Sequence, residues 1–454
     1  MDQPAHKSHL LKTIIVSQKP LMVWMRRLMM GLMVLLGLAG LRFAAFSLTR
    51  PNIYHKDFMQ EYLMAKAILA GLDPYQPLPE LATRFLGSLP QINLPHPTPH
   101  PPPVVFLGLP FSFTSYESAA MLWFVIELFF IAGSVYLMLK ALELKTTPLK
   151  VVFLTTVLLG FRPFVANLGY GQLMTLLLLL LISSWLKLKN GKDLPGGILL
   201  GTAMAIKLVA WPLVLFLLIQ RRWKAVLGAG LAFGAANLAA GLLMGFQRIV
   251  DYYVRVSAEV TPLYRAHEGN FSLFTIGYRL FEGTGAPGLS GLVARPLLSL
   301  PALALPVSLA LVGLFLILSI WLATRCRSFE AAFSLLVCSS LLLSPIFWVV
   351  YLILAVIPMG YVLKRLLCLD FPLLETWVAF LMLGFLIGPR EIIVGLLWRF
   401  PYEIVGDSEP VFSFASSLIS LLPTLAVFIT IWLVLRLQPV LSQESGSNGE
   451  VSLR

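Results

Sequence analysis

Apolar runs long enough to cross a lipid bilayer recur along almost the whole chain, and they constrain its fold more than any other feature. About 20 consecutive apolar residues span the hydrocarbon core as a helix, and only helices and closed barrels satisfy their backbone polar groups there. Of the 454 residues, 58% are hydrophobic and 12% are charged, whereas a soluble domain has about 25% charged residues. The sequence therefore predicts an all-α integral membrane protein, a multi-pass bundle of about 10–12 transmembrane helices.

The strongest runs define the expected domain. We place full crossings near 28–46, 119–139, 150–166, 171–187, 222–246, 303–324, 329–345, 347–363, 373–397 and 413–436. Two weaker segments remain, 104–113 and 193–219, and the first has the length of a re-entrant or interfacial piece. The sequence thus predicts a single polytopic membrane domain over 28–436. It is flanked by an N-terminal tail, 1–27, and by a polar C-terminal tail, 437–454, that we expect to be disordered.

Lysine and arginine concentrate in alternate connections between the runs. They fill the N-terminal tail and the connections near 140–150, 187–192, 220–224, 325–327 and 364–365. Short cytoplasmic loops carry an excess of these residues, so we expect a plasma-membrane protein with both termini in the cytoplasm. The long loops 47–102 and 247–302 then face outward. The net charge of +12 meets anionic lipid at the cytoplasmic surface, and we infer membrane lipids rather than nucleic acid as partners.

The same charge rule has a consequence for the segment 193–219. Because the connections on both sides of it fall on the cytoplasmic side, the segment would enter and leave the membrane on one side, turning near Lys207 and Pro212. Broken helices are tolerated at membrane depth only where they are buried in protein or line a wet cavity. The alternative is one full crossing, with a violation of the charge rule elsewhere. We favour the hairpin.

Asp57 lies just beyond the first run, at the head of a short predicted helix over 58–70. Asp57, Gln60 three residues later and Gly71 at the end have the pattern of a capped helix. Acidic residues are common N-caps for structural reasons alone, and a helix N-terminus would lower the pKa of the carboxyl and weaken it as a base. Few other residues in so apolar a chain could carry out acid–base chemistry, so Asp57 is the candidate catalytic base. Glu61, one turn later, is either a second functional carboxylate or a solvated side chain.

Several cations lie at or near the expected outward face. Lys207 interrupts an apolar run, where a charge costs about 2.5–3.5 kcal/mol, so it is either a functional residue or a lysine that extends to the surface. Arg162 lies at the outer end of a span. Four further groups occupy the second outer loop and together would suit an anionic ligand such as a lipid phosphate: Arg255, Arg265, His267 and Arg279.

No pattern in the chain indicates a metal or a cofactor. His96 and His100 are four residues apart, but the prolines between them prevent a helix. We therefore expect a rigid extended wall of the outer cavity rather than a metal-binding pair. The three cysteines, Cys326, Cys338 and Cys368, have neither metal-ligand spacing nor the arrangement of a disulfide framework. We expect no metal and no cofactor.

Six separated pieces of the chain share the order and spacing of one known family. They are Asp57-Phe58…Tyr62…Ala67…Gly71-Leu-Asp-Pro-Tyr75, Pro101-Pro-Pro103, Gly171-Gln172, Gly197…Gly201…Ala205-Ile-Lys207…Pro212, Asn270-Phe-Ser272…Arg279 and Ser344-Pro-Ile-Phe-Trp348. The chain resembles the polyprenyl-phosphate-sugar-dependent integral membrane glycosyltransferases, specifically glycosyltransferase family 87, whose named members are bacterial α-mannosyltransferases. The resemblance covers roughly 57–350, about two-thirds of the chain.

The resemblance implies a GT-C-like helix bundle with a juxtamembrane helix on the outer face and an outward, lipid-accessible cavity. It implies Asp57 as the catalytic base and a polyprenyl-phosphate sugar, with mannose as the expected hexose, as the donor to a lipid or glycan acceptor. We expect an inverting, metal-independent transfer in which cations meet the phosphate. Sugar hydroxyls would be bound by Gln172 and Asn270. Three aromatic residues would either line the sugar site or anchor the protein at the membrane interface: Tyr62, Tyr75 and Trp348.

One departure from the family concerns the specificity of the site. Family members often have a polar pair that includes His shortly after the Ser-Pro…Trp motif, and here those places hold Val350 and Tyr351. The sugar and the acceptor therefore stay open. The competing class is a transporter or lipid flippase, which also has broken helices and buried charges. The chain has no two-fold internal repeat, and its ionisable residues concentrate in the outer loops, so we favour the enzyme.

Overall fold

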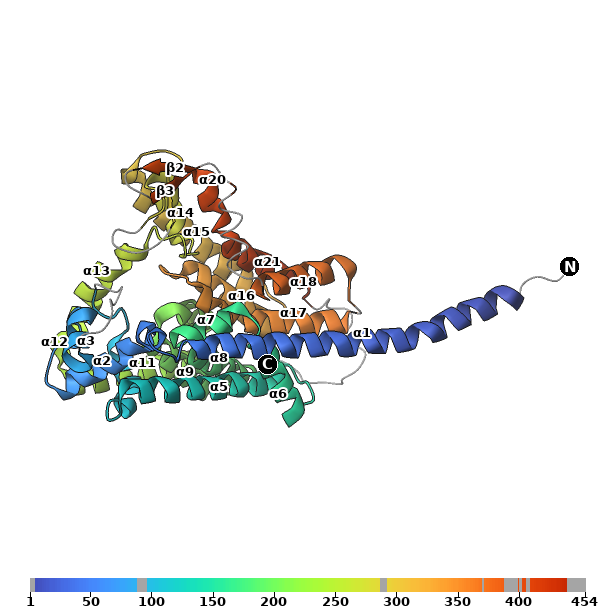
Figure 1. The fold of residues 1–454 in the computed structure, drawn as a ribbon, viewed down its shortest axis with the longest axis horizontal. Helices are drawn as coiled ribbons and strands as arrows, with labels where there is room; N and C mark the ends of the chain where they lie inside the picture. Colours follow the sequence, from blue (N-terminus) through green and yellow to red (C-terminus); the bar gives the residue numbers. More distant parts are fainter. Residues whose placement is uncertain are drawn as a thin grey trace.

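The computed structural model describes residues 5–87, 96–285, 292–369, 371–387, 399, 402–405 and 409–438. Helices make up nearly all of the described structure (Figure 1). Within the described ranges, five helical segments are long and apolar enough to cross a membrane. The prediction of an all-α, multi-pass membrane protein is therefore confirmed. Of the C-terminal tail 437–454, all but two residues lie outside the described residues.

The long spans begin with α1 (Ala5–Phe46), whose apolar part is Val23–Phe46 and whose N-terminal part extends the helix through the predicted tail (Figure 1). The others are α5 (Tyr116–Ala141), α11 (Trp223–Met244), Pro301–Thr324, which contains α15 (Ala304–Thr324), and Val349–Cys368, which contains α17 (Val356–Cys368). The helices α6 (Pro148–Leu158) and α7 (Arg162–Tyr170), bent by 82°, form either a sixth, broken span or a re-entrant loop.

Shorter helices account for the difference from the expected 10–12 crossings. Proline and glycine interrupt several of the predicted runs, because proline lacks the N–H that continues a helix. The run near 171–187 is α8 (Met174–Lys189), that near 329–345 is α16 (Phe329–Leu343), that near 373–397 begins as α18 (Leu373–Ile387), and that near 413–436 is divided into α20 (Phe414–Ile419) and α21 (Leu422–Arg436). By length alone, the described residues present five or six spans.

The basic connections lie together at one end of the bundle. Lys189, after α8, contacts Glu143 after α5 at 2.7 Å and Glu330 at the start of α16 at 3.1 Å. Lys364 of α17 reaches the same Glu143 at 3.3 Å. The neighbouring Arg365 donates to the Leu437 carbonyl at 2.8 Å. Exposed ion pairs of this kind add little stability, but they show that connections distant in sequence share one end, as their charges predict.

The segment 193–219 forms the expected hairpin. Its first arm, α9 (Asp193–Ile206), packs along α11, with Gly197 against Ala225 and Gly201 against Ala229. A Cβ at either glycine would come within 1.9 or 2.1 Å of an α11 carbonyl oxygen, so small residues permit this close approach. From the first contact to the second, both chains advance towards their C-termini, so α9 and α11 run parallel. The chain that connects the end of α9 to the start of α11 must therefore return to the end where α9 begins, and α10 (Trp211–Ile219) is the returning arm.

Short elements cover the opposite end of the bundle. They include α2 (Phe58–Leu69), α3 (Leu78–Leu86), α12 (Phe246–Asp251), a π-helical turn (Tyr252–Val256), α13 (Ser257–Val260) and α14 (Phe274–Phe281). The segment 104–113 is helical at α4 (Val105–Gly108) and packs against α2, since a Cβ at Gly108 would lie 2.0 Å from the Glu61 carbonyl oxygen. Figure 1 shows α2, α3 and α12 gathered at one end of the molecule.

A small sheet at this end was not expected from the sequence. Strand β3 (Glu409–Phe412) lies between β1 (Val293–Ala294), with which it pairs in parallel, and β2 (Tyr402–Val405), with which it pairs antiparallel. Figure 1 shows β2 and β3 close to α14 and α20. The sheet thus ties the second outer loop to the segment that precedes α20.

Candidate active site

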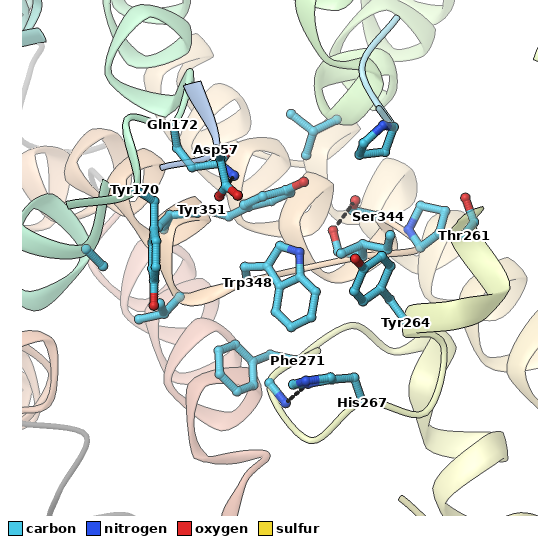
Figure 2. Close-up of a pocket in the computed structure, with 18 of the residues that line it drawn as sticks. Asp57, Tyr170, Gln172, Thr261, Tyr264, His267, Phe271, Ser344, Trp348 and Tyr351 are labelled. Atoms are coloured by element: carbon cyan, nitrogen blue, oxygen red, sulfur yellow. Dashed lines mark hydrogen bonds between the residues drawn. The ribbon is translucent and has the colours of Figure 1, made fainter. Parts of the chain in front are cut away.

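A cavity of about 930 Å³ lies at the end of the bundle covered by the short elements. Its size is within the range of small-molecule sites, roughly 300–1,000 Å³. It is lined by the predicted site residues Asp57, Arg162, Gln172, Lys207 and His267, and also by Trp348 and Tyr351. Figure 2 shows Asp57 and Gln172 side by side, with Trp348 projecting into the space between them and the loop that carries His267.

The backbone holds Asp57 against the end of α7. The Asp57 N–H donates to the Tyr170 carbonyl at 2.7 Å. The ammonium of the preceding residue, Lys56, donates to the carbonyls of Leu168 at 2.8 Å and Gly169 at 2.7 Å. The last carbonyls of a helix have no partner within the helix, so the lysine satisfies two of them. Asp57 is thereby attached to a membrane helix although it lies in the outer loop.

The side chain of Asp57 does not cap its own helix. Asp57 occupies the N-cap position of α2 but makes no side-chain capping bond. Instead, its Oδ2 accepts a hydrogen bond of 2.6 Å from Gln172 Nε2, and its Oδ1 accepts a weaker one of 3.4 Å from Gln60. The turn that presents Gln172 requires Gly171 in the left-handed conformation, with φ of 68°. The carboxylate is therefore oriented towards the cavity wall rather than towards the α2 backbone.

Lys207 continues this chain of polar contacts. It interrupts the hairpin between α9 and α10 in an extended conformation, and its Nζ lies 3.5 Å from Gln172 Oε1. The same ammonium lies 4.3 Å from the centre of the Tyr351 ring, a favourable cation–π geometry. Gln172, which was expected to bind sugar hydroxyls, thus connects the candidate base to a cation.

Burial raises the pKa of the Asp57 carboxyl above its ordinary value, although the hydrogen bond from Gln172 and the charge of His100 act in the opposite direction. The residue is half-buried, since one side borders the cavity while the rest lies deep in the protein. The helix N-terminus was expected to lower this pKa, and here burial outweighs that effect. A general base works best when its pKa approaches the working pH, so the environment improves Asp57 as a base.

A family comparison identifies the chain. The model of glycosyltransferase family 87 matches residues 99–345, more than half of the chain. The chain belongs to glycosyltransferase family 87. Comparison with curated proteins and with solved structures finds no match. The matched range contains Arg162, Gln172 and Lys207 but begins after Asp57, so the role of Asp57 depends on the geometry of the cavity.

Two of the predicted ligand residues of this glycosyltransferase support the cavity instead of lining it. The Arg279 side chain is 1% exposed and donates to the carbonyls of Asn270 at 2.8 Å, Glu268 at 3.0 Å and Ser417 at 2.7 Å. Asn270 is fully buried and bonds the backbone of the segments around 264–272 and 345–347. Both side chains are thus engaged with the backbone, and neither is among the described residues that line the cavity.

The remaining predicted residues of the family 87 enzyme also lie outside the lining that the described residues form. Arg255 contacts Glu259 at 3.8 Å, and Arg265 contacts Glu282 at 3.2 Å. On α2, Tyr62 donates its hydroxyl to the Thr114 carbonyl at 2.9 Å. Glu61, also on α2, is buried rather than solvated. Tyr75, predicted to line the sugar site, is buried as well and donates its hydroxyl to the His100 carbonyl at 3.2 Å.

An aromatic wall of the glycosyltransferase cavity was only partly anticipated. Trp348 makes edge contacts with Tyr264 at 5.5 Å and with His267 at 5.1 Å between ring centres. The Tyr264 hydroxyl bonds His96 Nε2. His96 and His100 line the cavity, as expected of the proline-rich segment. Tyr264 was missed, because one tyrosine in an outer loop gives no signal in the sequence.

Val350 and Tyr351, which stand where family members often have a polar pair, both line the cavity. The phenol ring of Tyr351 lies beside the Lys207 ammonium. The departure from the family pattern is therefore located at the candidate site itself, next to one of its cations.

Proposed function

We propose that this glycosyltransferase moves a hexose, with mannose as the first candidate, from a polyprenyl-phosphate donor to a lipid or glycan hydroxyl. The reaction would occur at the outer face of the plasma membrane, with Asp57 as general base. The observation that supports this most strongly is the hydrogen bond of 2.6 Å that holds the Asp57 carboxylate on Gln172, in the same cavity as Lys207.

The position of the cavity supports an outward orientation. Helix α9 has 14 residues and runs from the basic connection 187–192 to Lys207 at the cavity. At 1.5 Å per residue its length is about 21 Å, so the cavity and the basic connections lie at opposite ends of this helix. If the basic end faces the cytoplasm, the cavity opens on the outer side, where a polyprenyl-phosphate donor could enter from the lipid.

In the proposed reaction, the acceptor hydroxyl attacks the anomeric carbon from the face opposite the phosphate, which inverts the configuration. The acceptor O–H proton passes to Asp57, a bond forms between the acceptor oxygen and the anomeric carbon, and the bond from that carbon to the phosphate oxygen breaks. General base catalysis of this kind contributes roughly 10²–10⁴-fold. The electron pair of the broken bond stays on the phosphate.

Lys207 and Arg162 are the residues we assign to the phosphate. Both border the cavity at breaks in membrane helices, Arg162 at the first residue of α7 and Lys207 between α9 and α10. Positive groups that meet charge developing on a leaving group are usually the largest single contribution to catalysis. The aromatic wall around Trp348 then offers an apolar face to the sugar ring.

The test is transfer by Asp57→Asn in isolated membranes. Radiolabelled sugars would be supplied on polyprenyl phosphate, and in a parallel reaction as nucleotide sugars. We expect transfer from the lipid-linked donor by the wild type and a loss of at least about 100-fold in Asp57→Asn. Asp73→Asn is the matched control, because Asp73 lies in the same outer loop, is not among the described lining residues, and accepts the Tyr75 N–H through an oxygen that Asn retains. Retained transfer by Asp57→Asn, or transfer from the nucleotide sugar alone, would refute the proposal.

A further inference from the structure

A buried carboxylate next to the cavity has no part in the reaction described above. Glu61 lies one turn after Asp57 on α2 and is 1% exposed. Its Oε1 lies 2.6 Å from Nδ1 of His100. A buried carboxylate is costly unless it is paired, and among the described contacts of Glu61 the imidazole of His100 is the group that gains the opposite charge when it accepts a proton.

The backbone around His100 is held at two points. Its carbonyl accepts a hydrogen bond of 3.2 Å from the Tyr75 hydroxyl, and its N–H donates to Thr98 Oγ1 at 3.3 Å. The ring lines the cavity. Its Nδ1 lies close to Glu61 Oε1 but outside hydrogen-bond geometry, and we infer that Nε2 is the nitrogen that meets the cavity. A carboxylate beside an imidazole stabilises the imidazolium that forms when the ring accepts a proton.

The neighbouring histidine lacks this freedom. His96 uses Nδ1 on the Pro97 carbonyl at 2.7 Å and Nε2 on the Tyr264 hydroxyl. Both of its ring nitrogens are therefore engaged, whereas Nε2 of His100 has no hydrogen bond among the described contacts. Of the two cavity-lining histidines in this segment, His100 is the one arranged to exchange a proton.

The His100 segment is connected to Asp57 through Gln60. Gln60 donates to Asp57 Oδ1 at 3.4 Å, and its own Oε1 accepts from Thr98 Oγ1 at 3.1 Å. After burial and the bond from Gln172, the charges of His100 and Glu61 are the next influences on the pKa of Asp57; His100 lowers it and Glu61 raises it. The pair is thus close enough to Asp57 for their protonation states to be coupled.

We propose, on the basis of the proposed function, that His100 and Glu61 form a proton-accepting pair that returns Asp57 to its ionised form after each transfer. The Asp57 O–H bond breaks and the proton passes, directly or through a cavity water, to Nε2 of neutral His100. The imidazolium is stabilised by the Glu61 carboxylate at Nδ1. His100 then releases the proton to water in the cavity. Glu61 is a positioning residue in this scheme, and His100 is a second acid–base residue.

Other titratable groups interact with the pair or with Asp57, and they belong to any account of its pH dependence. Asp57, Tyr116 and Glu127 interact electrostatically with Glu61, and the Tyr75 hydroxyl bonds the His100 carbonyl. The groups that interact electrostatically with Asp57 include Lys56, His96, Lys207 and Tyr264. Burial lowers the pKa of His96, which disfavours a charge on that ring. We assign the proton to His100, whose imidazole is in contact with a carboxylate.

The experiment measures kcat and KM between pH 5 and 9 for His100→Gln and Glu61→Gln. We expect kcat to fall about 10- to 100-fold with KM within about threefold, and the acid limb of the kcat profile to move. Imidazole in the buffer should restore activity to His100→Ala, and Glu61→Asp should retain more activity than Glu61→Gln. The matched controls are His55→Gln and Glu80→Gln, since both residues are exposed and are not among the described lining residues. Profiles identical to these controls would overturn the proposal.

A second measurement separates this inference from the proposed function. If the wild type transfers no sugar from any lipid-linked donor, the proposed function fails, but the pair can still be tested without substrate. Infrared difference spectra between pH 5 and 8 should contain a carboxylate signal that disappears in Glu61→Gln and changes its pH dependence in His100→Gln. If neither variant alters the spectrum, the two residues do not share a proton and the inference is wrong.

Discussion

Two regions carry cations at the cavity end of this glycosyltransferase, and their surroundings differ. Breaks in the membrane helices place Arg162 and Lys207 on the cavity. The long loop 247–302 supplies Arg255, Arg265 and Arg279, which contact glutamates or backbone carbonyls away from the described cavity lining. We propose that the first region presents charge to the donor, whereas the second uses charge to hold the protein together.

The difference follows from what surrounds each charge. An outer loop offers carboxylates and free carbonyls, so an arginine there finds a partner within the protein. A lysine inside an apolar run has few such partners, and Lys207 reaches only an amide oxygen and an aromatic ring among its described contacts. A charge that the fold places in apolar surroundings is therefore a better guide to function than a group of charges in a loop.

The largest effect should come from removing the best-buried cation of the loop. Arg279→Met would leave the carbonyls of Glu268, Asn270 and Ser417 without their donor. Each buried polar group left unsatisfied costs about 1–3 kcal/mol, so we expect a loss of at least about 3 kcal/mol in stability. Thermal unfolding in detergent measures it. A variant that unfolds like the wild type but fails in transfer would instead make Arg279 a ligand residue and remove the contrast between the two regions.

The next largest effect should distinguish the two regions by how much each contributes to transfer activity. Lys207→Met should reduce kcat/KM for the lipid-linked donor about 10²–10³-fold, the range found when one electrostatic stabiliser is removed. Arg255→Met, the matched control in the loop, should stay within about twofold, because Arg255 is half exposed beside Glu259. Lys207→Arg should recover part of the activity by keeping the charge. Equal losses in Lys207→Met and Arg255→Met would show that the loop cations also meet the donor.

Much of the fold followed from local sequence. Apolar runs and basic connections predicted the membrane class and the shared basic end, and the charge rule predicted the hairpin that turns at Lys207. The number of full crossings was less accessible, because prolines and glycines divided several runs into short helices. The sheet formed by β1, β2 and β3 pairs segments more than a hundred residues apart, and such short strands leave no periodic signal.

The candidate site was predictable where a residue type was unusual for its surroundings. Asp57, Gln172 and Lys207 were expected together, and they are connected by hydrogen bonds. Arg279 and Asn270 were assigned to ligands because partners such as the Ser417 carbonyl lie far away in sequence. Glu61 and His100 were considered separately, and only the fold brings their side chains into contact.

The smallest expected effect concerns the stability of the protein as a function of pH. It tests whether Asp57 belongs with the cavity residues or with the paired charges of the loops. Burial raises the pKa of Asp57 above its ordinary value of 3.8, so the folded protein binds this proton more tightly than the unfolded chain does. The wild type should therefore gain stability from this group as the pH falls through the raised pKa towards 3.8. Each unit by which the pKa is raised corresponds to about 1.4 kcal/mol.

Asp57→Asn is uncharged at every pH, so it should unfold at a higher temperature than the wild type at pH 7, and the difference should shrink in acid. Asp73→Asn controls for the general effect of acid on the outer loops. The measurement is the unfolding midpoint of all three proteins in detergent between pH 4 and 8. If Asp57→Asn is less stable than the wild type at pH 7 and the deficit grows with pH, the carboxylate is stabilised by its surroundings. Asp57 would then resemble the paired charges of the outer loop rather than a base kept available for a substrate.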